Sequence, residues 1–260
     1  MLYSEEKIMT ALGEYRDTVR IIIDDVTAST NDKGKAIALC GEKKNTLILA
    51  LRQDKGKGRL GRSFFSPEGG IYMSLVIPET GLDAEEIPLI TPAAAVAVCR
   101  AIEKLTPVRP RIKWVNDIFC YDGKAAGILT ETVFTGEVFF PVVGIGINLL
   151  PPEGGFPEEL KGIAASVYRE EDVLPEDIMS LLVGETVREL LDLIKVIGIR
   201  GFSDEYRRRS FVIGKEVRVI KNGESREAQV LDIDENCRLG VKYRDGSEEY
   251  LFGGEISLRF

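Results

Sequence analysis

The spacing of the apolar residues changes at about Phe211, and this change limits the possible folds most strongly. Before it, apolar runs of strand length alternate with amphipathic helical patterns. After it, short alternating runs are separated by turn pairs such as Asn222-Gly223 and Asp245-Gly246. The first pattern favours an α/β (α+β) domain in which helices flank a mixed β-sheet, and the second favours a small all-β unit. We therefore predict two domains, residues 1–210 and 211–260.

Helix caps, apolar periods and turn residues predict the elements of the first domain. Ser4 followed by Glu5 and Glu6 is typical of a helix N-cap with acids in the first turn. Thr135-Gly136 predicts the turn of a hairpin. The expected helices cover about residues 5–15, 31–40, 91–104, 175–194 and 199–208, and the expected strands about 20–24, 46–51, 71–77, 110–114, 118–121, 125–132 and 142–147.

Composition excludes several classes of function. The 260 residues include no histidine, which excludes Ser-His-Asp hydrolysis and His-ligated metal centres. The net charge of -8 disfavours nonspecific nucleic-acid binding. No run approaches the roughly 18 apolar residues of a membrane helix, and the N-terminus does not resemble a signal peptide, so we expect a cytoplasmic protein. No CxxC pair occurs, and buried reduced thiols are expected at Cys40, Cys99, Cys120 and Cys237.

The segment Arg52–Arg62, RQDKGKGRLGR, holds five cations against one carboxylate in an otherwise acidic chain. Its glycines allow the backbone to approach a ligand and leave N–H groups to cradle phosphate oxygens. Gly56–Gly61 also matches the dinucleotide fingerprint, but Pro67 disfavours the helix which that motif requires. The segment predicts an anion-binding loop, with a solvated basic loop as the alternative.

Two further segments carry candidate functional residues. In RIKWVNDIFCYDGKAAGILTE, a hairpin would bring Lys113, Asp117 and Lys124 toward one rim of the sheet, although an exposed lysine and turn formers are the alternative. In VVGIGINLL, Gly144 and Gly146 alternate on one face of a strand. Their missing side chains make room for either a ligand or a packed helix.

Taken together, the ordered motifs GKGRLGRSFFSP, KWVND, GKAAGILTE and GIGINL resemble the catalytic core of biotin protein ligases, whose patterns run GRGRxGRxW, KWPND, KxxGIL and GIGIN. Ser29-Thr30-Asn31 and the closing GGEISLR also fit. The resemblance covers about residues 25–260. It implies a class II aminoacyl-tRNA synthetase/biotin ligase-like catalytic domain followed by an SH3-like β-barrel.

The resemblance implies an AMP-forming ligase. Such an enzyme uses ATP, biotin and Mg²⁺ to form biotinyl-5′-AMP and pyrophosphate, and then transfers biotin to a lysine of a biotin carrier protein domain. Lys124, Arg59 and Asp117 match the catalytic positions, with Asp117 orienting or deprotonating the acceptor lysine. No dedicated metal ligand is implied.

The resemblance also assigns binding positions. Ser29, Thr30 and Gln53 match residues that hold the biotin head, and Lys57, Phe64 and Val115 depart from the usual Arg, Trp and Pro. The full set of implied binding residues is Ser29, Thr30, Asn31, Gln53, Gly56, Lys57, Gly58, Arg59, Arg62, Phe64, Tyr72, Ser74, Asn116, Lys124, Gly127, Leu129, Gly144, Gly146, Asn148 and Arg259.

Alternatives and partners complete the expectations. A lipoate or octanoate ligase or transferase shares the fold, and a non-catalytic biotin-binding module is a further alternative. Only 28 residues precede Ser29, too few for the helix-turn-helix domain of repressor members, so no operator binding is expected. A homodimer through a sheet edge is a family-level expectation.

Overall fold

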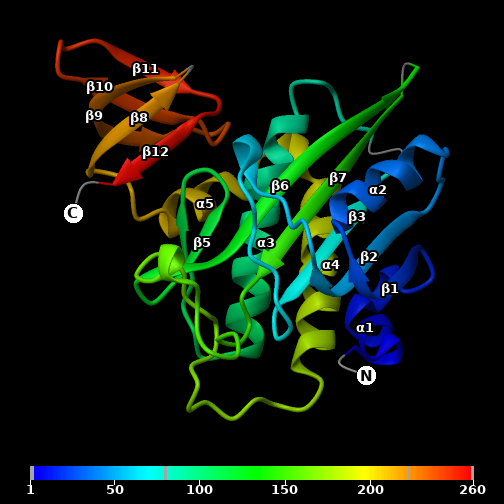
Figure 1. The fold of residues 1–260 in the computed structure, drawn as a ribbon. Helices are drawn as coiled ribbons and strands as arrows, with labels where there is room; N and C mark the ends of the chain where they lie inside the picture. Colours follow the sequence, from blue (N-terminus) through cyan, green and yellow to red (C-terminus); the bar gives the residue numbers. More distant parts are fainter. Residues whose placement is uncertain (1–2, 79–80, 137, 222, 259–260) are drawn as a thin grey trace.

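A seven-stranded mixed sheet organises the first part of the chain (Figure 1). The computed structural model describes residues 3–78, 81–136, 138–221 and 223–258. The sheet order is β1-β2-β3-β7-β6-β5-β4; β1 and β2 are parallel and the other neighbours antiparallel. Its strands are β1 (Val19–Thr27), β2 (Asn45–Gln53), β3 (Ile71–Val76), β4 (Arg111–Lys113), β5 (Asp117–Cys120), β6 (Gly123–Thr135) and β7 (Val138–Ile147).

Helices cover both faces of this sheet. On one face, α2 (Thr30–Leu39) packs over β2, β3, β6 and β7. On the other face lie α1 (Glu5–Leu12), α3 (Ile90–Leu105) and α4 (Ile178–Lys195), while α5 (Ser203–Arg209) leads toward the second sheet (Figure 1). The expected mixed sheet flanked by helices is confirmed.

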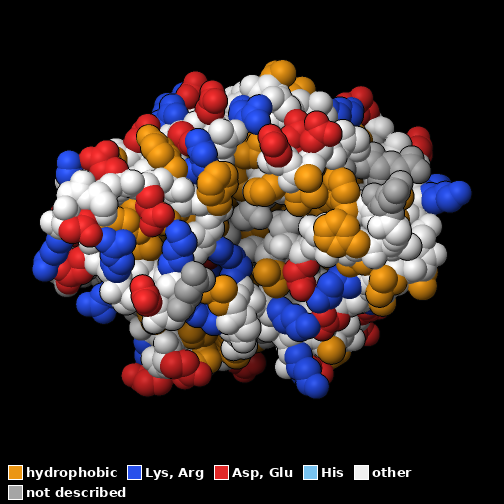
Figure 2. Space-filling view, turned by 90° about the horizontal axis from the view of Figure 1, so that it is seen from above, with side chains coloured by type: hydrophobic (Ala, Val, Ile, Leu, Met, Phe, Trp, Pro, Cys, Tyr) orange, Lys and Arg blue, Asp and Glu red, His pale blue; other side chains and the backbone are white. Residues whose placement is uncertain are grey.

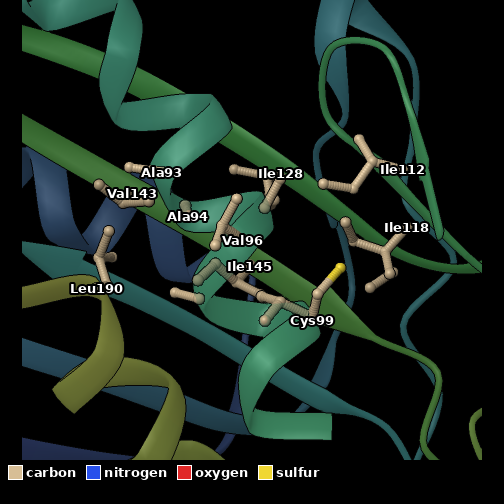
Figure 3. Packing of buried hydrophobic residues seen from close by; sticks show 14 of the residues in the cluster. Ala93, Ala94, Val96, Cys99, Ile112, Ile118, Ile128, Val143, Ile145 and Leu190 are labelled. Carbon is tan, nitrogen blue, oxygen red and sulfur yellow. The ribbon is translucent and has the colours of Figure 1, made fainter. Parts of the chain in front are cut away.

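Side chains alternate along each strand, so the core lies on one face of the sheet and the polar site on the other. Met73 and Leu75 of β3 point into the large core, whereas Ser74 points to the α2 face. On the core side, small residues of α3 such as Ala94 let the helix approach β6 and β7 closely, where Ile128 and Ile145 pack against it (Figure 3). Each such fully buried apolar side chain contributes on the order of 1.5–3 kcal/mol. The sheet is thereby held rigid beneath the α2 face.

The second sheet contains five antiparallel strands in the order β11-β10-β9-β8-β12 (Figure 1). They are β8 (Glu216–Lys221), β9 (Glu224–Ile233), β10 (Leu239–Tyr243), β11 (Glu248–Leu251) and β12 (Glu255–Leu258). The expected small all-β unit is thus confirmed, while the boundary at residues 210 and 211 stays a prediction.

Several expected elements differ in extent. β6 and β7 extend beyond the predicted ends to form a long hairpin, which turns at Gly136 with φ 63°, as the Thr135-Gly136 pair predicts. The last helix begins at Ser203 instead of residue 199, because Arg200 adopts φ 54°, a left-handed conformation that interrupts a helix.

Two expectations from composition can be compared with the structure. Cys99, Cys120 and Cys237 are buried free thiols, but the expectation is wrong for Cys40, which is exposed at the C-terminal end of α2. Within the described residues, no helix combines the length and apolarity needed to cross a membrane.

Candidate functional site

The start of α2 forms a buried polar floor with neighbouring strands. Ser29 is the N-cap in extended conformation and accepts a hydrogen bond from the Asp32 backbone N–H, which places Thr30 and Asn31 in the first turn. Thr30 donates through its N–H and hydroxyl to Gln53 Oε1 (2.9 and 3.1 Å). Ser74 is fully buried, lies 2.8 Å from Thr30 Oγ1 and donates to Asn31 Oδ1. This floor presents fixed donors and acceptors to a ligand.

Glycines shape the wall beside the polar floor. Gly127 of β6 and Gly146 of β7 are direct cross-strand neighbours, and the Phe64 ring lies on them. A Cβ at Gly146 would meet the Phe64 ring at 2.5 Å, and one at Gly144 would meet Asn31 Oδ1 at 2.2 Å. Gly144 therefore makes room for helix α2, which was one of the two alternatives, whereas Gly146 makes room for the Phe64 ring, which was neither.

A charged rim follows on β4, β5 and β6. Lys113 and Asp117 are directly opposite each other in register, and the next strand supplies Lys124, whose Nζ lies 2.7 Å from Asp117 Oδ1. Asn116 donates to the Ile128 backbone carbonyl, which fixes its amide beside this rim. The peptide bond between Trp114 and Val115, where the family motif has proline, is cis.

The basic loop, residues 54–67, bridges the two sheets. Arg59 donates to Asn116 Oδ1 (2.9 Å) and to the Gly254 carbonyl (3.1 Å), and Arg62 forms a 2.5 Å ion pair with Glu255. Burial lowers the pKa of Arg59, although an arginine keeps its proton throughout the physiological range. The short 3-10 turn Arg59–Gly61 stands where the sequence predicts irregular loop. A cationic loop therefore closes over the rim.

Two cavities meet beneath this loop. With the open solvent at their mouths included, the floor cavity on the α2 face has an empty volume of about 450 Å³, and the interdomain cavity between the rim and β12 has about 620 Å³. They share Gly58, Arg59, Phe64, Asn116 and Lys124. Figure 2 shows this side of the molecule hollowed between the C-terminal sheet on the left and the β6–β7 hairpin on the right. Hydrophobic side chains lie along the upper edge of the hollow in this view.

Most of the predicted binding residues line these cavities. The floor cavity is lined by Ser29, Thr30, Asn31, Gln53, Lys57, Gly58, Arg59, Phe64, Asn116, Lys124, Gly127, Leu129, Gly144 and Gly146. The interdomain cavity adds Arg62 and Asp117. Residues as far apart in the sequence as Ser29 and Gly146, 117 positions, thus line one cavity.

Other predicted residues lie behind the cavity walls. Asn148 donates to the Ala165 carbonyl at 3.1 Å and lies under the Lys124 backbone, so it positions the lysine rather than lining a cavity. Tyr72 is buried, donates to the Pro67 carbonyl and packs its ring edge against Phe64. Gly56 packs against the Phe64 backbone. Arg259 lies outside the described residues.

The binding set implied by the resemblance leaves out several residues that line the interdomain cavity, among them Lys113, Gly254 and Glu255. Lys113 belongs to the KWVND motif, and the hairpin pattern already predicts its place at the rim. Glu255 lies within GGEISLR, but its pairing with Arg62, 193 positions away, leaves no local pattern in the sequence.

Comparison with known proteins identifies the family. The model described as biotin/lipoate A/B protein ligase family matches residues 24–148, and that of the biotin protein ligase C terminal domain matches residues 212–259. The biotin--[acetyl-CoA-carboxylase] ligase of Paracoccus denitrificans is 30% identical over 242 residues, which are 88% of this chain and 98% of that protein. The chain belongs to the biotin protein ligase family.

Biotin protein ligases of known structure share this architecture. The one from Aquifex aeolicus, in complex with biotin and ATP, has 26% sequence identity and a TM-score of 0.74, over 92% of this chain and 98% of that one. The bifunctional ligase/repressor BirA proteins of Bacillus spizizenii and Bacillus subtilis are each 38% identical over 166 residues, 63% of this chain. The match spans 51% of those two curated proteins, about half their length.

Proposed function

We propose that the chain is a biotin protein ligase, which forms biotinyl-5′-AMP from biotin and ATP and then transfers the biotinyl group to a lysine of a biotin carrier protein domain. The observation that carries this proposal is that a cavity on a buried polar floor and a cavity at a cationic rim share lining residues. The Aquifex aeolicus relative, whose structure contains biotin and ATP, supports it.

The polar lining of the floor cavity matches the hydrogen-bonding groups of biotin. A ureido head has two N–H donors and one carbonyl acceptor, and Thr30, Asn31 and Gln53 offer partners for them in a buried setting. Phe64 and Leu129, which also line the cavity, give apolar surface beside these groups. The dithiolane ring of lipoate has no such donors or acceptors and could form none of these hydrogen bonds. The floor therefore favours biotin.

The first step joins two anions. A carboxylate oxygen of biotin attacks the α-phosphorus of ATP, the bond from that phosphorus to the bridging oxygen breaks, and pyrophosphate leaves with the electron pair. Lys124 and Arg59, at the boundary of the two cavities, offset the charge of the carboxylate and the α-phosphate. Arg62 adds positive charge once ATP competes for its contact with Glu255.

Mg²⁺ would arrive with the nucleotide. The described residues contain no cluster of three or more His, Cys, Asp or Glu side chains suited to a metal ion. Asp117 and Glu255 nevertheless line the interdomain cavity, and one or two carboxylates with phosphate oxygens are a usual Mg²⁺ environment. The ion supplies further neutralisation of phosphate charge.

The second step needs an uncharged acceptor amine. Its nitrogen attacks the acyl carbon of biotinyl-5′-AMP, the acyl–oxygen bond breaks, AMP leaves, and the amine loses a proton. Asp117 is the rim carboxylate that we assign to orient or deprotonate that amine. The loop held by Arg59 and Arg62 covers the mixed anhydride and shields it from water.

We also propose a cytoplasmic location, in keeping with three buried free thiols.

We further propose that the protein forms a homodimer through the edge of the seven-stranded sheet. Strand β1 lies at the edge of the seven-stranded sheet and carries the half-buried Ile21, Ile22 and Ile23. Such an edge offers unpaired backbone groups to a second strand. Sedimentation of the chain with and without biotin and ATP would measure the oligomeric state.

One assay tests the proposed activity. The protein is incubated with ATP, Mg²⁺ and either biotin or lipoate, and pyrophosphate and acyl-adenylate are measured. A biotin carrier domain with its acceptor lysine, and the same domain with that lysine changed to arginine, then receive the product. We expect adenylation of biotin alone and transfer only to the lysine form. Faster adenylation of lipoate, or none of biotin, would contradict the proposal.

A further inference from the structure

Lys113, at the end of β4, is a half-buried cation that the reaction as described does not use. Its side chain lines the interdomain cavity. In the part of the chain that the structure describes, no carboxylate lies within ion-pair distance of its ammonium. Asp117, opposite in register, is engaged by Lys124 at 2.7 Å.

The other charges of this cavity leave Lys113 uncompensated. Glu255, the second carboxylate of the lining, is held by Arg62 at 2.5 Å. Arg59 bonds only neutral oxygens, those of Asn116 and Gly254. Four cations thus face two carboxylates that are both already paired, and the cavity has an excess of positive charge.

An uncompensated, partly buried cation is unfavourable, because burial removes water from the charge. Desolvation lowers the pKa of Lys113; the neighbouring Lys124 and Arg62 act in the same direction, and Asp117 and Glu255 oppose them. An anion that entered the cavity would offset this cost. The excess positive charge of the cavity therefore favours the binding of an anionic ligand.

The geometry of in-line displacement indicates which anion this is. The carboxylate nucleophile approaches the α-phosphorus from the floor cavity, so the leaving group departs on the opposite side. Beyond Lys124 and Arg59, that side is the interdomain cavity. We propose that Lys113 binds the β- and γ-phosphates of ATP and holds the pyrophosphate as it leaves. This inference rests on the proposed adenylation.

The test measures pyrophosphate and biotin affinity separately, without turnover. Inorganic pyrophosphate with Mg²⁺, and biotin, are each titrated calorimetrically into the wild type, Lys113→Gln and Lys113→Arg. Lys55→Gln, which removes a lysine of the basic loop that lines neither cavity, is the matched control. We expect Lys113→Gln to weaken pyrophosphate binding about tenfold or more, with biotin binding unchanged. Lys113→Arg should keep most of the affinity, and Lys55→Gln all of it.

A pH series adds a second readout. Pyrophosphate needs the protonated ammonium, so wild-type affinity should fall as pH rises through the lowered pKa of Lys113, and Lys113→Gln should lack this part of the decline. The inference would be overturned if Lys113→Gln bound pyrophosphate within twofold of the wild type. It would also be overturned if Lys113→Gln and Lys113→Arg each lost biotin binding and pyrophosphate binding equally. If the wild type forms no biotinyl-5′-AMP, the proposed function fails instead.

Discussion

Lys124 and Asp117 form a partly buried ion pair whose members have different tasks in the two proposed steps. The lysine offsets phosphate and carboxylate charge in the first step, and the aspartate faces the acceptor amine in the second. Their register follows from the bulge between Ile118 and Phe119, which brings Lys124 opposite Phe119 and leaves Asp117 opposite Gly127. A single hairpin therefore supplies both charges.

Lys124→Ala should reduce pyrophosphate release at saturating substrates by about 100- to 1,000-fold, because a preorganised charge contact to the transition state is lost. Single-turnover kinetics with biotin and ATP would measure the effect. Biotin affinity should change much less, because the polar floor is untouched. Turnover near that of the wild type would refute a role for this amine.

Gly146→Ala should displace Phe64, since the new methyl group would lie 2.5 Å from the ring. The ring can rotate away, so we expect little change in Tm but about a tenfold rise in the apparent KM for biotin. Gly201→Ala is the control, because its nearest neighbour would be 4.0 Å away. Equal KM values for the two variants would count against the role of Gly146 in making room for Phe64.

At the scale of elements, the basic loop is held on two sides. Arg59 and Arg62 attach it to the C-terminal sheet, and Lys57 attaches it to α2 through a 2.6 Å ion pair with Asp32. Asp32 also contacts Lys35, and both lysines lower the pKa of its carboxyl group, Lys57 more strongly. Lys57, which replaces the usual family arginine, thus forms an ion pair with helix α2 in this structure.

Lys57→Gln should loosen the loop and release biotinyl-5′-AMP faster, by about two- to fivefold, as expected for an ion pair that is partly exposed. Retention of the preformed adenylate in a dilution chase is the measurement, and Lys55→Gln is the control. The difference between the two variants should shrink at high salt. If the two variants released biotinyl-5′-AMP at identical rates at low salt, the Lys57–Asp32 ion pair would have no role in retaining it.

The sequence predicted the elements better than their contacts. Buried runs such as Thr46–Leu51 and the Ala-rich helix before Leu105 were found because their apolar patterns are local. The end of β6 was missed because polar and apolar residues mix there, and the start of β7 was missed because Pro141 interrupts its apolar run. The pairing of Arg59 with the Gly254 carbonyl depends on domain docking, which no local pattern encodes.

At the scale of the whole molecule, the C-terminal sheet is fixed to the catalytic rim. The buried Trp114 indole donates to the Cys237 carbonyl at 2.9 Å, and Ser203 donates to the Glu235 carbonyl at 2.6 Å. Tyr206, fully buried, donates to the Val115 carbonyl at 3.0 Å. These contacts place Gly254 and Glu255 at the loop, so the C-terminal sheet completes the interdomain cavity.

Trp114→Phe should leave the Cys237 carbonyl without its partner and destabilise the interface by about 1–3 kcal/mol. We expect a lower Tm together with a higher apparent KM for ATP, while the KM for biotin stays within about twofold. Thermal unfolding and steady-state kinetics measure these quantities. A change in Tm with an unchanged KM for ATP would show that docking does not shape the nucleotide site.

The central claim is that the basic loop and Lys124 together surround biotin and ATP while they react. A crystal structure with a non-hydrolysable biotinyl-5′-AMP analogue tests it most directly. We predict the biotin head on Thr30 and Gln53, and the phosphate mimic about 3 Å from Lys124 Nζ and the Arg59 guanidinium. An analogue bound with the loop and Lys124 both turned away from it would contradict the claim.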